Sequence, residues 1–120
     1  MIKHIVCIRF KPGIGETDIA ELAKSLGALP PKIPEIRSFE FGPDILHTER
    51  SLDFALVASY EDVEALKRYQ AHPDHLPVLE KARELAEKIL VVDFKIQGSP
   101  EEDPRDSTAS IGRGKGSLTW

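Results

Sequence analysis

The chain has 120 residues, of which 30% are charged and 41% hydrophobic, and its formal net charge at pH 7 is −4. This length suits one domain with an ordinary core, and the scattered Lys and Arg residues form no basic patch for nucleic acid. No apolar run reaches the roughly 20 residues that a membrane helix needs, and the N-terminus lacks the features of a signal peptide. We therefore expect a cytoplasmic protein with neither a nucleic-acid nor a membrane partner.

Four short apolar stretches, rich in β-branched and aromatic residues, predict β-strands. They are residues 2–11, 36–41, 53–60 and 89–96. Pro12-Gly13 ends the first stretch and Gly42-Pro43 ends the second, because these residues favour turns over strands.

Three amphipathic patterns between these stretches predict helices. Thr17 is the predicted N-cap of a helix over residues 18–29, which Pro30-Pro31 ends. Glu61-Asp62 opens a second helix, since acidic residues stabilise a helix N-terminus. Pro73 fits the first position of a third helix. The inner face of that third helix is predicted to carry Leu76, Leu79, Ala82, Ala86 and Ile89.

The element order βαββααβ predicts an α+β fold with its helices on one face of a sheet. Residues 98–120 differ from the rest, because Gly, Ser, Pro, Asp and Glu dominate them. The chain therefore divides into a folded domain over residues 1–97 and a polar C-terminal tail over residues 98–120. The alternative for the tail is an ordered arm that packs on the domain or on a partner, with Trp120 as its anchor.

The first and last predicted strands are apolar on both faces. In the first strand Ile2, His4 and Val6 share one face, whereas Ile5 and Cys7 lie on the opposite face. A sheet with helices on one side and water on the other should alternate cleanly between apolar and polar residues. The second face therefore needs a cover, and we expect a homodimer through this open face. A tail or loop folded across the face is the alternative.

The segment 69–75, Tyr-Gln-Ala-His-Pro-Asp-His, places a phenol and two imidazoles between two helices. His75 is expected in the first helical turn, where the helix dipole lowers its pKa and favours a neutral, basic imidazole. Tyr69 can hydrogen-bond a substrate oxygen, and His4 can orient a ligand or His75. Each residue also has a purely structural explanation. His72 suits a helix cap, Tyr69 a core position, His75 a solvated surface and His4 a bond to a backbone carbonyl.

Other chemical signals are absent from the sequence. Two histidines three residues apart fall short of a zinc site, which usually needs three or four ligands. The chain has no dinucleotide-binding glycine motif, no phosphate-binding loop, no nucleophile elbow and no paired cysteines. We therefore expect neither a metal nor another cofactor.

Several of these segments together resemble one known family. Lys3-His4-Ile5-Val6, the segment 69–75 and Val91-Val92-Asp93-Phe94 are similar to the stress-responsive dimeric A/B barrel (Dabb) family, over about residues 1–97. The resemblance implies a ferredoxin-like βαββααβ monomer with a four-stranded antiparallel sheet, paired into a dimeric α+β barrel. Some members are cofactor-free polyketide cyclases or lyases.

In those cyclases a Tyr/His acid–base pair matches Tyr69 and His75, and an N-terminal pocket histidine matches His4. A further pocket histidine of the cyclases is replaced here by Phe54, so a more apolar pocket is implied. We expect a homodimer that binds a small apolar aromatic or carbonyl compound between sheet and helices. The alternatives are a cofactor-free cyclase or lyase and a cofactor-independent monooxygenase. The candidate catalytic residues are Tyr69, His75 and His4, and the candidate ligand-binding residues are Phe54, Leu56, Val6 and His72.

Overall fold

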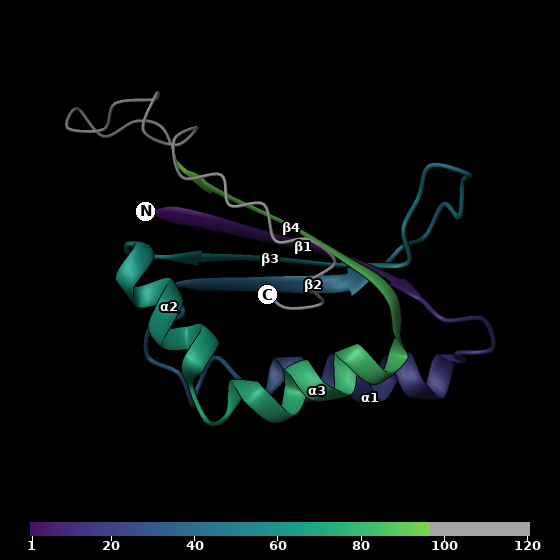
Figure 1. Cartoon of the computed structure of the whole chain (residues 1–120), viewed down its shortest axis with the longest axis horizontal. Helices are drawn as coiled ribbons and strands as arrows, with labels where there is room; N and C mark the ends of the chain where they lie inside the picture. The colour runs from purple at the N-terminus through teal and green to yellow at the C-terminus, as the bar shows by residue number, and fades with distance from the viewer. Residues whose placement is uncertain (97–120) are drawn as a thin grey trace.

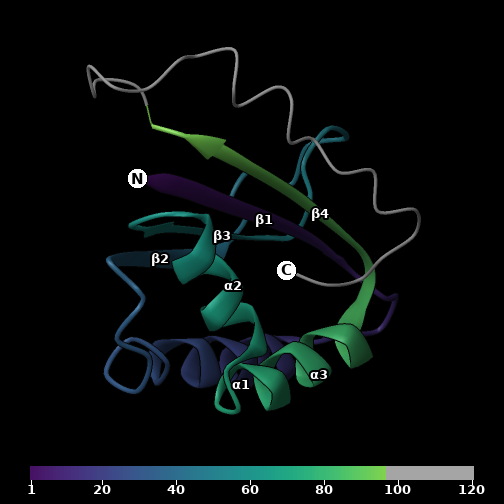
Figure 2. The same cartoon turned by 60° about the vertical axis from the view of Figure 1, so that its left-hand side comes forward.

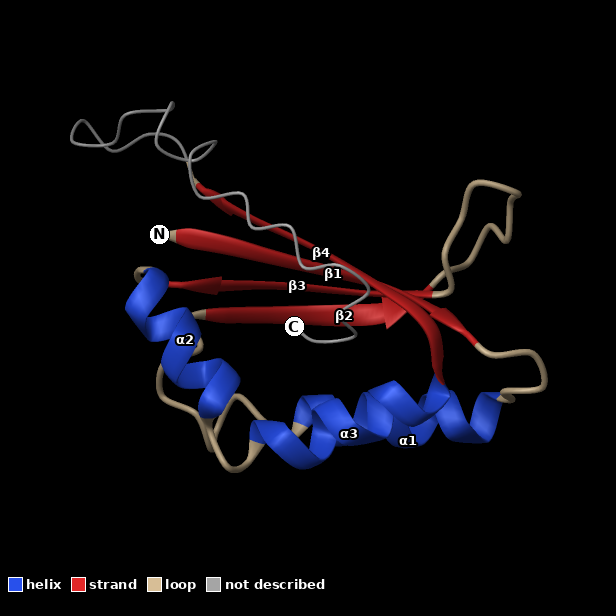
Figure 3. Cartoon of the chain, in the orientation of Figure 1, coloured by secondary structure: helices blue, strands red, loops and turns tan. Residues whose placement is uncertain are grey.

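A four-stranded antiparallel sheet carries three helices on one of its faces in the computed structural model, which describes residues 1–96 (Figures 1 and 3). The elements are β1 (Ile2–Phe10), α1 (Glu16–Gly27), β2 (Ser38–Pro43), β3 (Phe54–Tyr60), α2 (Val63–Ala71), α3 (His75–Leu85) and β4 (Ala86–Lys95). The strand order β2-β3-β1-β4 makes this a ferredoxin-like α+β fold, as predicted. The tail expected over residues 98–120 lies outside the described residues.

The face of the sheet that the helices cover, the inner face, holds the core (Figure 2). Alternate residues of β1 lie on this face, and each is at most 8% exposed. These residues are Ile2, His4, Val6, Ile8 and Phe10. Leu22 and Leu26 of α1 and Leu79 of α3 are also buried in the core, which places the apolar stripes of both helices against the sheet.

The opposite face, the outer face, is apolar but uncovered by the helices. Leu90, Val92 and Phe94 of β4 are 50%, 60% and 39% exposed. Cys7 pairs with Leu90 and Ile5 with Val92 across the β1–β4 ladder, so these side chains form one continuous patch. In Figure 1 the loop between β2 and β3 rises on the same side, away from the helices. The two-faced apolar pattern expected from the sequence is therefore present.

The first helix begins earlier than expected. Gly15 is its N-cap, and Thr17 lies inside the first turn instead of capping it. The Gly15 amide donates a hydrogen bond to the Asp18 side chain at 3.4 Å, so Asp18 supplies a partner for a free backbone donor at the helix start.

The third helix begins at His75, and the prediction that Pro73 starts it is wrong. His72 has extended backbone angles, as expected for a residue that precedes proline. The next two residues form a turn, in which the Asp74 amide donates to Nδ1 of His72 at 3.0 Å and the His75 amide donates to the His72 carbonyl at 2.9 Å. Pro77 instead occupies the first turn of α3, where its missing donor is not needed.

The same helix ends sooner than predicted. Ala86 already has extended backbone angles, so α3 passes into β4 without an intervening loop. Ala86 and Ile89, expected on the inner face of the helix, enter the core from β4 instead. Leu76 was also expected on that inner face, but it is 49% exposed, so the prediction for Leu76 is wrong. No helix within residues 1–96 has the length and apolar character needed to cross a membrane.

Candidate functional site

Five polar side chains from five different elements meet beneath the helices. They are His4 (β1), Tyr60 (β3), Tyr69 (α2), His75 (α3) and Asp93 (β4), which we call the buried cluster. The rings of Tyr69 and His75 are 4.4 Å apart between centroids, those of Tyr60 and Tyr69 4.9 Å, and those of His4 and Tyr69 6.2 Å. All four ringed residues are 0% exposed. The structure therefore brings Tyr69, His75 and His4 together, away from bulk water.

His75 is held in one tautomer. Its Nδ1 lies 3.2 Å from the Gln70 carbonyl oxygen, which only accepts, so Nδ1 carries the proton. In the neutral ring Nε2 is then the basic nitrogen. Burial lowers the pKa of His75 to about 4, the Gln70 carbonyl opposes this shift, and nearby His4 and His72 add to it. His75 should therefore be a neutral imidazole near pH 7, as the sequence predicted. The main cause of its low pKa is burial, and not the helix dipole.

His4 is held by a carboxylate on the neighbouring strand. His4 and Asp93 pair across the β1–β4 ladder, and Nδ1 of His4 donates a hydrogen bond to the Asp93 carboxylate. Nε2 of His4 has no hydrogen-bond partner within residues 1–96. A carboxylate on one ring nitrogen fixes the orientation of the ring and directs the other nitrogen toward the cluster.

Asp93 connects the buried cluster to the surface. Its side chain is 36% exposed, whereas that of His4 is fully buried. Asp93 lies at an open pocket of about 240 Å³ between α2 and the ends of β1 and β4. The other lining residues are Ile2, Val63, Leu66, Lys67, Gln70, Phe94 and Lys95. Asp93 therefore links the buried ring of His4 to this solvent-accessible pocket.

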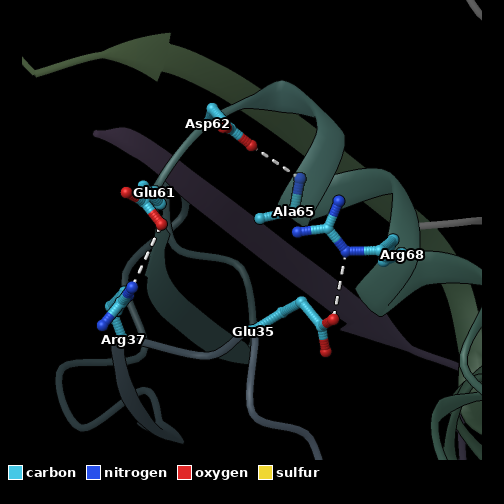
Figure 4. Close-up of polar contacts among 6 residues, drawn as sticks. All are labelled: Glu35, Arg37, Glu61, Asp62, Ala65 and Arg68. Carbon is cyan, nitrogen blue, oxygen red and sulfur yellow. Dashed lines mark hydrogen bonds and ion pairs between the residues drawn. The ribbon is translucent and has the colours of Figure 1, made fainter.

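Helix α2, which carries Tyr69, is fixed over the sheet by polar contacts at its exposed side (Figure 4). Asp62 caps it by accepting a hydrogen bond from the Ala65 amide at 2.8 Å. Arg68 of the helix pairs with Glu35 at 3.1 Å, and the hydrogen bond from Arg68 lowers the pKa of the Glu35 carboxyl. A second ion pair joins Arg37, just before β2, to Glu61, which lies between β3 and α2.

The predicted apolar lining residues lie on the inner face beside the cluster. Val6, Phe54 and Leu56 are 1%, 2% and 2% exposed. Rings continue from the cluster toward them, with Phe39 at 6.4 Å from Tyr69 and Phe41 stacked on Phe54 at 6.3 Å. The polar cluster therefore has an aromatic, apolar wall on one side.

His72 lies outside this arrangement. Its Nδ1 accepts the hydrogen bond from the Asp74 amide, and its side chain is 24% exposed. This corresponds to the structural interpretation given to His72 from the sequence. Among residues 1–96, no three His, Cys, Asp or Glu side chains are grouped in a way that could hold a metal ion.

Two members of the cluster, Tyr60 and Asp93, were not identified from the sequence. Tyr60 looked like the end of a strand, but it lies on the inner face next to Tyr69. Asp93 carried a usable signal, since it is an acidic residue within an otherwise apolar strand, on the same face as Ile89 and Val91. The strand register that places Asp93 opposite His4 could not be read from the sequence.

Helices on one face of an antiparallel sheet, above a buried His/Tyr cluster, define a ferredoxin-like α+β domain with a candidate acid–base site. A profile of the Stress responsive A/B Barrel Domain family matches residues 2–96, and the chain belongs to this family.

Three similar proteins are informative. A stress-response A/B barrel domain-containing protein of Arabidopsis thaliana is 28% identical over 96 residues, which cover 78% of this chain and 88% of the relative. Olivetolic acid cyclase of Cannabis sativa is 26% identical over 95 residues, covering 78% and 94% of the two chains. A dimeric ferredoxin-like protein of unknown function from Thermobifida fusca superposes with a TM-score of 0.74 at 28% identity, covering 79% of this chain and 90% of the other.

Proposed function

We propose that this protein is a homodimer that binds a small aromatic or carbonyl compound at the buried cluster. The observation that carries the proposal is the convergence of His4, Tyr69 and His75, all fully buried, with Nε2 of His4 lacking a partner within residues 1–96. Leaving a buried polar atom unpaired costs free energy, so such atoms need an explanation. A ligand oxygen that forms a hydrogen bond with Nε2 of His4, beside the aromatic wall formed by Phe39 and Phe54, would explain this unpaired atom.

The outer face supports the dimeric part of the proposal. Leu90, Val92 and Phe94 form an exposed apolar patch on β4, and such patches mark interfaces more often than solvated surface. A second copy of the same face is the simplest cover, because most soluble oligomers are symmetric homo-oligomers. The Thermobifida fusca protein, which has the same fold, is described as dimeric.

The second candidate function is cofactor-free cyclisation or lyase chemistry at the same site, favoured by the contact between Tyr69 and neutral His75. Nε2 of His75 would remove a proton from a carbon next to a carbonyl, leaving the electron pair as an enolate. Tyr69 would donate a hydrogen bond to the oxygen on which that charge develops. The enolate carbon would then attack a second carbonyl, and the new alkoxide would take up the proton that His75 had removed.

The low basicity of His75 limits this chemistry. A base whose conjugate acid has a pKa of about 4 removes only acidic protons efficiently. This condition favours carbon acids flanked by two carbonyl groups over simple ketones. Olivetolic acid cyclase is one of the similar proteins, which supports the same reaction class.

Histidine NMR of the full chain tests the binding proposal. The ring signals of His4 and His75 would be followed from pH 4 to 8, with and without a panel of phenols and β-diketones. We expect at least one ligand to shift both rings and to change their titration. His47, whose side chain is 76% exposed in the β2–β3 loop, is an internal control that should not respond. If no ligand affects His4 or His75, the proposed binding function is wrong.

Turnover separates the two candidate functions. His75→Gln keeps a polar group at the site but removes the base, and Tyr69→Phe removes only a hydroxyl. A cyclase or lyase would lose most of its turnover of a β-diketone substrate in both variants, while a binding protein would show no turnover in any form of the chain.

A further inference from the structure

Tyr60 has a hydroxyl group in a position where phenylalanine would be the simpler residue. It is the last residue of β3, lies on the inner face and is 0% exposed. Its hydroxyl makes no hydrogen bond of ordinary geometry within residues 1–96, although the Tyr69 hydroxyl lies near enough to interact with it. A buried hydroxyl without a partner destabilises a fold, and phenylalanine would fill the same volume without that cost. The hydroxyl therefore needs a role other than packing.

The surroundings of Tyr60 indicate that role. Its ring is 4.9 Å from that of Tyr69 and 6.0 Å from that of His4, so it packs directly against two of the candidate catalytic residues. Nε2 of His4 is likewise without a partner within the described residues. Two such atoms in one cluster point to a polar group that meets both of them.

Tyr60 is suited to donate a proton in a hydrogen bond and not to act as a base. Burial raises its pKa well above the ordinary value, and the neighbouring Tyr69 hydroxyl and the Asp93 carboxylate raise it further. The phenol therefore keeps its proton at neutral pH. Preorganised neutral donors in a dry site stabilise an oxygen that carries negative charge.

We propose that Tyr60 is a second hydroxyl donor of the ligand site, and that Tyr60 and Tyr69 together bind a negatively charged ligand oxygen, such as a phenolate or an enolate. This inference rests on the proposed function and narrows its ligand class. The ligand would be a compound with an acidic hydroxyl or an enolisable carbonyl, held by that oxygen. An apolar compound of the same shape would gain nothing from Tyr60.

Binding of 4-nitrophenol to the full chain tests the inference, because the ionised form of this probe is coloured and its pKa in the bound state can be measured. In Tyr60→Phe we expect the pKa of bound 4-nitrophenol to rise by about one unit, and the affinity for the phenolate to fall about tenfold. The affinity for 4-nitrotoluene, which has the same shape but no hydroxyl, should not change.

Ser59→Ala is the matched control. Ser59 is the adjacent residue of β3 and is also buried, but its hydroxyl lies on the outer face and pairs with that of Ser38. Its removal should leave the pKa of bound 4-nitrophenol unchanged. If Tyr60→Phe does not fold, the ¹³Cζ signal of Tyr60 in the labelled wild-type protein replaces it, and this signal must move when 4-nitrophenol binds.

The outcomes separate this inference from the proposed function. If the wild-type protein and Tyr60→Phe bind 4-nitrophenol equally, or if the Tyr60 signal stays fixed on binding, Tyr60 is not a donor and the binding function stands. If the wild-type protein binds neither 4-nitrophenol nor 4-nitrotoluene nor any other compound of the phenol and β-diketone panel, both proposals fall.

Discussion

Both faces of the sheet carry apolar residues, but they differ in what covers them. On the inner face the helices reduce Val6 and Ile8 of β1 to 1% and 2% exposure. On the outer face Leu90 and Val92 of β4 remain 50% and 60% exposed. The helices of the same chain complete the inner face, whereas within residues 1–96 no helix covers the outer face (Figure 1). The comparison shows that an apolar strand pattern predicts that a face is buried but does not identify what buries it.

The largest loss of folding stability should come from removing an aromatic ring on the inner face. Phe54 contacts Phe10 and Phe41 and is 2% exposed. Phe54→Ala should lower the free energy of unfolding by about 3–5 kcal/mol, because it leaves a cavity that the sheet cannot close. The matched change on the outer face is Phe94→Ala.

Urea unfolding at several protein concentrations distinguishes the two positions. The loss caused by Phe54→Ala should be nearly the same at every concentration, because the contacts that it removes lie within one chain. The loss caused by Phe94→Ala should depend on concentration, since it acts through association. Equal behaviour of the two variants would contradict the difference between the faces.

The second-largest expected change in folding stability is its dependence on pH, which arises from His75 on the inner side of the sheet. His75 has a pKa of about 4 in the folded chain and an ordinary value of 6.5 when unfolded, so between these values the unfolded chain binds more protons. Stability should therefore fall as the pH drops from about 6.5 to about 4, by about 3 kcal/mol in total. Above pH 6.5 this group should have no further influence.

The contribution of His75 is measured by difference, because carboxylates also titrate in this range. His75→Gln cannot take up the proton, so its unfolding free energy should decline less between pH 6.5 and pH 4 than that of the wild-type protein. Parallel curves for the two proteins would mean that His75 is protonated in the folded state.

A charge on the outer face should act on association alone. Leu90→Asp would bury a carboxylate against the partner and should weaken dimerisation about a hundredfold, measured by sedimentation equilibrium. Leu76→Asp is the matched control, because Leu76 is 49% exposed on α3, on the helical side of the molecule. If both variants remain dimeric, the outer face is not the interface.

The smallest effect is expected at the rim of the helical layer. Arg37 and Glu61 form an ion pair at 3.1 Å, but their side chains are 55% and 67% exposed. Arg37→Gln should change the free energy of unfolding by about 0–1 kcal/mol, and added salt should reduce the difference further. A larger loss in thermal unfolding would mean that this pair holds α2 more firmly than its exposure indicates.

Much of the fold was predictable because its signals are local. Pro12 and Pro30 lie just beyond the ends of β1 and α1, and the two-residue period of β1 assigns each side chain to a face. Gly42-Pro43 was expected to end the second strand, but β2 runs through Pro43, because both residues still pair with β3. Helix boundaries were less predictable where several residues compete. Thr17 is a good N-cap by type, but Gly15 with Asp18 takes that position.

The candidate site was predictable where its residues are close in sequence, and for His4 through the resemblance to the family. Tyr69 and His75 share one short segment, so their proximity followed from the sequence. Tyr60 and Asp93 join them through strand register, which depends on the packing of the whole sheet. A single sequence contains no direct record of register, and so these two residues were missed.

The direct passage from α3 into β4 makes the length of that helix part of the site. Leu85 ends the helix and Ala86 begins the strand, so no loop is present to absorb an extra or missing residue. Because neighbouring residues of a strand point to opposite faces, one deletion at this junction would exchange the two sides of β4. Asp93 would then point to the outer face and Phe94 toward His4. Insertions and deletions at residues 85–86 should therefore be far less tolerated than substitutions there.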